Sequence, residues 1–138
     1  YMQQLIRESQ STGINTFIID LSRSGPVYEK NFQMVKNSGL KIVTRIVVFP
    51  DGGNPAQVKS PAYWKQRYQL VEKAISLGAD EIQLDYIRYN TKQRPSDQNA
   101  KDVLEVIKYF SQNTKSKGVP LQVAFFGETS FKPSPRIG

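Results

Sequence analysis

The 138-residue sequence contains no cysteine and no histidine. Without cysteine there is no disulfide, no thiolate nucleophile and no cysteine-ligated metal site. Without histidine, a Ser-His-Asp triad, a histidine zinc site and a histidine general base are excluded as well. Acid–base chemistry carried by these residues must therefore use Asp, Glu, Lys or Tyr.

Long apolar runs are also missing. No stretch approaches the roughly 20 residues that a helix needs to cross a bilayer, so we expect no membrane partner. The first ten residues, YMQQLIRESQ, lack the basic and apolar regions of a signal peptide and resemble a helix already under way. We expect residues 1–138 to form a single α/β domain that is a fragment of a larger protein, which leaves the localisation open.

The net charge is +7, and an excess of this sign suits an anionic partner. The lysines and arginines are scattered over helices and loops with acidic residues among them, and no basic–aromatic recognition module is present. We therefore expect no nucleic-acid partner.

One unit recurs four times along the chain: an amphipathic helix, a glycine and an apolar strand. The strand segments are INTFIIDL after Gly13, LKIVTRIVVF after Gly39, DEIQLDYIRY after Gly78 and VPLQVAFFGE after Gly118. Strands separated by single helices pair in parallel through right-handed crossovers. This predicts an α/β fold that is either an open doubly wound sheet or about half of a (β/α)8 TIM barrel.

Side-chain alternation favours the barrel. Residues of a strand alternate between its two faces, and one consistent register places Asp20, Arg45, Asp85 and Glu128 on the same face. The opposite face is apolar and suits packing against helices, whereas an open doubly wound sheet would need two apolar faces. We predict a partial (β/α)8 barrel with four parallel strands in sequential order. Because half a barrel leaves two strand edges open, self-association is expected if these residues stand alone.

The third helix has the clearest boundary signals. Ser60 is a candidate N-cap, Pro61 a first helical residue and Gly78 a C-terminal stop. The loop from Pro50 to Pro55 does not match a phosphate loop or a dinucleotide fingerprint. We expect it to be a connector on the same side of the sheet as the acidic strand ends.

Asp85 is the strongest candidate for a catalytic residue. It lies near the C-terminal end of a strand expected to be buried on both sides, where an unpaired carboxylate costs several kcal/mol. Arg45, on the neighbouring strand, is its expected partner, and a salt bridge that only fixes strand register is the structural alternative. Paired carboxylates at a barrel mouth suit glycoside hydrolysis, in which one acid protonates the leaving oxygen while the other attacks or activates water.

Further candidates lie at the other strand ends. Glu128 is the candidate second catalytic carboxylate, and Asp20 is a candidate substrate-binding residue. In a regular strand, the side chain of Arg88 would point to the face opposite that of Asp85. Beyond the strand end, however, this side chain is able to reach over the site. Tyr86 is expected to pack against a helix rather than act in catalysis, and it stands with Arg88 among the substrate-contact candidates.

Two other functions fit the same residues. Asp20, Asp85 and Glu128 could ligate Mg²⁺ in a metal-assisted barrel enzyme, although acidic metal sites usually hold more carboxylates. A non-catalytic carbohydrate-binding protein would need only the binding residues. The favoured prediction includes neither a metal nor a cofactor.

Three segments carry a family resemblance: residues 14–20, the run TRIVVF from Thr44 to Phe49, and LGADEIQLDYIRY. The last fits the pattern Gly-x-Asp-Glu-Ile-Gln-x-Asp-Tyr-x-Arg. Together they resemble an uncharacterised bacterial family of glycosyl hydrolases with an amylase-like TIM-barrel catalytic domain. The resemblance runs from about Gly13 to Gly127 and implies that these strands are the second to fifth of eight.

The resemblance also implies a carbohydrate substrate in a site lined by Asp85, Asp20 and Arg45. In amylase-like barrels the nucleophile ends the fourth strand, which is the position of Asp85. The acid follows the fifth strand, where this chain offers Glu128. The family's Asp within the fifth strand is replaced here by Ala124.

Overall fold

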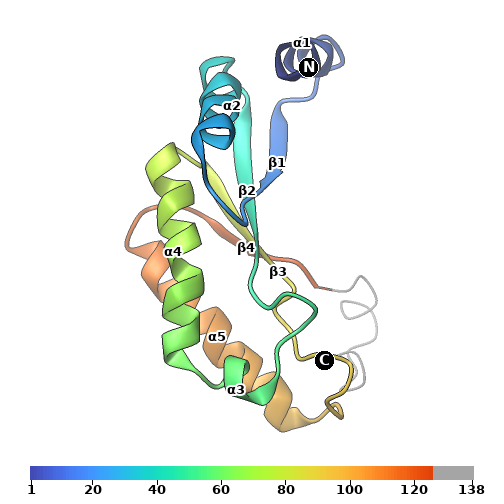
Figure 1. Cartoon of the computed structure of the whole chain (residues 1–138), viewed down its shortest axis with the longest axis vertical. Coiled ribbons are helices and arrows are strands. Elements are labelled where there is room, and N and C mark those ends of the chain that lie inside the picture. The colour runs from blue at the N-terminus through green and yellow to red at the C-terminus, as the bar shows by residue number, and fades with distance from the viewer. Residues whose placement is uncertain (126–138) are drawn as a thin grey trace.

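The computed structural model describes residues 1–125, in which helices and strands alternate as the repeated unit predicts (Figure 1). The elements are α1 (Met2–Ser11), β1 (Thr16–Asp20), α2 (Pro26–Asn37), β2 (Lys41–Val47), α3 (Pro55–Val58), α4 (Pro61–Leu77), β3 (Glu81–Asp85), α5 (Asp97–Lys115) and β4 (Leu121–Val123). Strand β4 has 3 residues and is much shorter than the apolar segment that predicted it.

The four strands form one parallel sheet in the order β1-β2-β3-β4. The predicted parallel pairing and sequential order are both confirmed. A doubly wound sheet reverses its strand order at a switch point, and no such reversal occurs in the described part of the chain. The carboxyl ends of the strands therefore meet at a single edge of the sheet.

The helices form one layer against this sheet. Helix α2 contacts α1 on one side and α4 on the other, and α4 contacts α5, so the helices follow one another in the same order as the strands. Helices α2 and α4 pack on β2, and α5 packs on β4, on the same side of the sheet (Figure 1). Successive helix–strand units are thus placed side by side along the sheet, with their helices on one face rather than on both faces.

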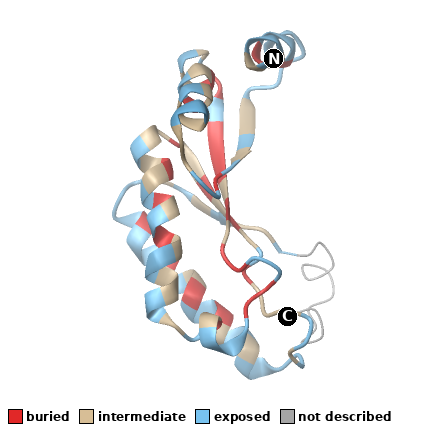
Figure 2. Ribbon diagram, in the orientation of Figure 1, coloured by how far each residue is buried: buried red, intermediate tan, exposed pale blue. Residues whose placement is uncertain are grey.

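The hydrophobic core lies between the helices and one face of the sheet. Ile42, Ile46, Ile82 and Leu84 alternate onto this face and are fully buried. The helices contribute further buried side chains, among them Phe32, Val35, Val71, Val106 and Phe110. Figure 2 shows these buried positions along the central strands and on α4 and α5. The predicted apolar face is therefore the helix-covered face.

The other face of the sheet is open within residues 1–125. Ile18, which alternates with the core residues of β1, is 60% exposed on this side. We expected the strand of Asp85 to be buried on both faces, but in β3 the residues of this face, Glu81, Gln83 and Asp85, are only partly buried. The helices that contact the sheet, α2, α4 and α5, pack on its other side. The open face is the one that carries the acidic strand ends.

Local signals set the helix boundaries as expected. The Ser60 hydroxyl accepts a hydrogen bond from the backbone N–H of Tyr63 at 3.2 Å, Pro61 begins α4, and Gly78 ends it in the left-handed conformation. The loop from Pro50 to Pro55 is not only a connector, because its end starts the short helix α3. Asn54 caps α3 by exchanging hydrogen bonds with Gln57 in a capping box.

No helix within residues 1–125 is both long enough and apolar enough to cross a membrane.

Candidate functional site

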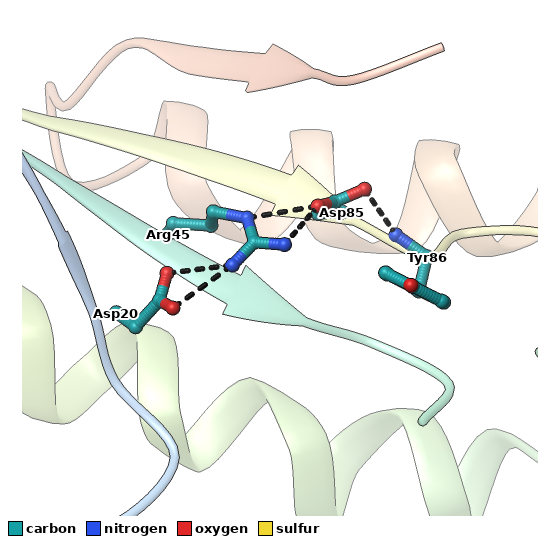
Figure 3. A network of polar contacts seen from close by, with 4 residues as sticks. All are labelled: Asp20, Arg45, Asp85 and Tyr86. Atoms are coloured by element: carbon teal, nitrogen blue, oxygen red, sulfur yellow. Dashed lines mark hydrogen bonds and ion pairs between the residues drawn. The ribbon is translucent and has the colours of Figure 1, made fainter. Parts of the chain in front are cut away.

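Three charged side chains meet on the open face near the carboxyl ends of the strands (Figure 3). Arg45 Nη1 donates to both carboxylate oxygens of Asp20, at 2.8 and 2.9 Å. From its other side, Arg45 donates through Nε (2.8 Å) and Nη2 to Oδ2 of Asp85. One guanidinium therefore holds two carboxylates from two different strands.

Strand register explains why these residues meet. Asp20 is paired directly with Arg45 across β1 and β2. The register partner of Arg45 on β3 is Gln83, and Asp85 lies two residues further along on the same face. The long arginine side chain spans this offset. The predicted common face of Asp20, Arg45 and Asp85, and the predicted pairing of Arg45 with Asp85, are both confirmed.

The cluster is partly exposed rather than buried. The side chains of Arg45 and Asp85 are 28% and 23% exposed, and that of Asp20 is 66% exposed. The hydrogen bonds that Arg45 donates to Asp20, and then those that it donates to Asp85, raise the pKa of Arg45 above its ordinary value. Both carboxylates are accessible to solvent from the open face of the sheet.

Both oxygens of Asp85 are engaged. Arg45 binds Oδ2, and the backbone N–H of Tyr86 donates to Oδ1 at 2.7 Å. Figure 3 shows these contacts on opposite sides of the carboxylate. Two fixed donors hold the carboxyl plane in one orientation, which a nucleophile or general base requires.

Tyr86 is not buried under the helix layer as its alternation predicted. Strand β3 ends at Asp85, and Tyr86 has a φ of +52°, which breaks the alternation. The residue is 38% exposed, and the guanidinium carbon of Arg88 lies 5.1 Å from its ring centroid. Arg88 also donates through Nη1 to the backbone oxygen of Tyr89 at 3.2 Å. Beyond the strand end, Tyr86 and Arg88 thus lie together next to Asp85.

The loops after β2 and β3 are joined by a backbone bridge that sequence analysis missed. Gly53 N–H donates to the oxygen of Arg88 at 2.8 Å, and the N–H of Asn90 donates to the oxygen of Gly53 at 2.9 Å. The preceding Gly52 has a φ of +84°, and a Cβ there would lie 2.7 Å from the Cα of Asn90. The adjacent glycines, Gly52 and Gly53, are the sequence feature that could have indicated this bridge, because glycine permits two backbones to approach closely. The bridge fixes the segment that follows Asp85.

The first aspartate of the DEIQLD segment has a structural role. Asp80 accepts hydrogen bonds from Lys36 Nζ at 2.9 and 3.0 Å and from the N–H of Ile42 at 2.8 Å. Burial opposes ionisation, but these bonds lower the pKa of Asp80 below its usual value. Asp80 ties β3 to α2 and β2 at the amino ends of the strands, far along β3 from Asp85.

Glu128, the candidate acid, lies outside the described residues. Within residues 1–125, no three Asp or Glu side chains gather in a way that could hold a metal ion. The guanidinium of Arg45 lies between Asp20 and Asp85, in the position that a shared cation would take. The described donor set therefore does not favour a metal between these two carboxylates.

The fold has known structural relatives. No protein-family model and no curated protein matches the chain. A hypothetical protein from Ruminiclostridium thermocellum matches with a TM-score of 0.69 at 17% identity, over 89% of this chain and 90% of that one. Protein SMc04130 from Sinorhizobium meliloti matches with a TM-score of 0.67 at 18% identity, over 93% of this chain. The match covers 47% of the Sinorhizobium protein, so this chain spans about half of its length. At these identities the likeness shows a shared α/β fold alone.

Proposed function

We propose that this chain is a sector of a (β/α)8 barrel and carries part of the site of a glycoside hydrolase. Four parallel strands in sequential order, with one layer of helices in the same order, support the barrel. In such barrels the reacting groups come from the carboxyl ends of the strands. Asp20 and Asp85 end β1 and β3.

The observation that carries the proposal is the shared arginine clamp. Arg45 holds Asp20 and Asp85 on the open face at one end of the sheet. Glycosidic cleavage passes through an oxocarbenium-like transition state, which a neighbouring ionised carboxylate stabilises. Arg45 binds one oxygen of Asp85 and the N–H of Tyr86 binds the other, so the carboxylate is held in one orientation.

In this mechanism Asp85 acts as the nucleophile or as the general base that activates water. A second carboxylic acid protonates the leaving oxygen, and Glu128 is the candidate for it. Asp20 and Arg45 contact the sugar hydroxyl groups next to Asp85, because both present polar atoms to the open face. Arg88 and Tyr86 form the adjoining wall.

The test is Asp85→Asn, which keeps the side-chain shape and removes its charge. In the full-length protein that contains this sector, we expect kcat to fall about a thousandfold or more on a glycan panel, because both the nucleophile and its charge are lost. The Arg45–Asp85 pair is partly exposed, so we expect a stability cost of about 1–2 kcal/mol, between the values for exposed and buried pairs.

Asp20→Asn is the matched control, since it removes the other carboxylate of the same arginine. It should alter KM more than kcat. Normal hydrolysis by folded Asp85→Asn protein would contradict the catalytic role. Glycan binding by the wild type without any hydrolysis would instead assign the site to a carbohydrate-binding protein.

A further inference from the structure

Tyr86 has an unusual backbone for its residue type. Its φ is +52°, in the left-handed region. Asp51 is the other non-glycine residue with positive φ in the described part of the chain. Aspartate tolerates this conformation because its short polar side chain bonds locally, whereas a bulky aromatic residue adopts it only when its surroundings impose it. Such strain is concentrated at functional sites.

The strained conformation changes where the ring lies. Regular alternation would place Tyr86 with Ile82 and Leu84, which are fully buried under the helices. Tyr86 is instead 38% exposed, at a position where burying its ring against the helix layer would have been favourable. Burial in the hydrophobic core therefore does not explain the strain.

The same turn couples the ring to the candidate nucleophile. The N–H of Tyr86 is the donor that binds Oδ1 of Asp85 at 2.7 Å. The ring in turn lies 5.1 Å from the guanidinium carbon of Arg88, whose backbone oxygen is held by Gly53. The residue that carries the exposed ring is therefore tied to the carboxylate through its backbone N–H (Figure 3) and to Arg88 through its ring.

We propose that Tyr86 is a stacking platform for a pyranose ring in the subsite next to Asp85. An aromatic ring of fixed orientation binds the apolar C–H face of a sugar, while neighbouring polar groups bind its hydroxyls. The inference rests on the proposed carbohydrate function and adds the residue that selects a ring with a flat C–H face. The backbone strain is retained because it keeps the platform on the side of the reacting carboxylate.

The first arm of the test measures the strain and needs no ligand. Tyr86→Gly and Tyr86→Ala both remove the ring, but only glycine adopts positive φ without strain. We expect the glycine variant to melt about 3–5 °C above the alanine variant. Equal melting temperatures would overturn the claim that the conformation is imposed.

The second arm uses the full-length protein that contains this sector and measures its binding by calorimetry to hexasaccharides of glucose, galactose and N-acetylglucosamine. For the hexasaccharide that the wild type binds best, Tyr86→Ala should weaken the affinity about tenfold and Tyr86→Phe should retain it. Tyr1→Ala is the control, because Tyr1 is 96% exposed and lies at the start of α1. In turnover, Tyr86→Ala should raise KM and leave kcat within about twofold.

The outcomes separate the inference from the proposed function. Tyr86-dependent binding without hydrolysis by the wild type supports the platform and overturns the hydrolase. Hydrolysis that depends on Asp85 but has an unchanged KM in Tyr86→Ala overturns the platform and leaves the hydrolase in place. Absence of binding to all three hexasaccharides by the folded wild type overturns the platform.

Discussion

At the residue scale, the two aspartates of the DEIQLD segment have different contacts. Asp80 immediately precedes β3, and Asp85 is the last residue of β3. Asp80 binds Lys36 and a backbone N–H of β2 and so joins the sheet to α2. Asp85 binds Arg45 on the open face. A single motif therefore combines a structural carboxylate at the amino end of the strand with a candidate functional one at the carboxyl end.

Gly53 gives a prediction at the same scale. A Cβ at this position would overlap Cγ2 of Val58 and lie 3.0 Å from Cγ of Phe49. Both neighbours are fully buried, so neither can move freely. We expect Gly53→Ala to lower the free energy of unfolding by about 1–3 kcal/mol in urea denaturation, as overpacked cores do.

Gly25→Ser is the control for this substitution, because a Cβ at Gly25 meets no atom within 4 Å. Its backbone is extended and it precedes α2 as the N-cap, a position that serine favours. We expect Gly25→Ser to be neutral or slightly stabilising. A Gly53→Ala protein as stable as this control would show that the joined loops do not depend on the absence of a side chain.

At the scale of elements, helix starts are set by local chemistry. Ser60 and Ser96 each accept a hydrogen bond from a backbone N–H in the first turn of α4 and α5. Asn54 accepts the corresponding hydrogen bond in α3, but this helix has only 4 residues, too few to show apolar periodicity. Capping residues can therefore be recognised in the sequence, whereas the short helix α3 could not be predicted from it.

The N-cap of α4 can be tested by Ser60→Ala. Loss of the 3.2 Å bond from the N–H of Tyr63 leaves an unpaired donor at the start of the 17-residue helix. We expect the free energy of unfolding to fall by about 1 kcal/mol, measured by chemical denaturation followed by circular dichroism. The matched control is Ser76→Ala in the last turns of α4, where serine binds only the oxygen of Lys73. There alanine should be neutral or stabilising, and an equal loss in both variants would argue against the cap.

At the scale of the whole molecule, the sheet has one covered face and one open face. In the described residues, β1 and β4 are edge strands, since each pairs with one neighbour only. Ile18 presents a mostly exposed apolar side chain on the open face of β1. Open parallel edges beside exposed apolar surface favour association.

We therefore expect the isolated 138-residue chain to associate with itself in size-exclusion chromatography with light scattering. Ile18→Lys should shift the population towards monomer, because it places a charge on the open face without disturbing the core. The control Val27→Lys changes an exposed residue in the first turn of α2, away from that face, and should have no effect. A clean wild-type monomer with cooperative unfolding would contradict the expectation.

The sequence by itself determined the order of the elements, the parallel pairing and the face on which Asp20, Arg45 and Asp85 meet. Glycine stops, proline starts and strand alternation are local signals, and a repeated helix–strand unit restricts how strands pair. Because side-chain direction in a strand has a period of two, the common face of the charged residues was readable from spacing alone.

The tertiary structure decided what depends on contacts between distant segments. It alone revealed the bridge between Gly53 and the loop after β3, the sharing of Arg45 by two carboxylates and the left-handed turn at Tyr86. Alternation predicted a buried Tyr86, but the residue is 38% exposed because regular strand geometry ends one residue earlier, at Asp85. The partial exposure of the site also came from the structure, since it depends on which face of the sheet the helices cover.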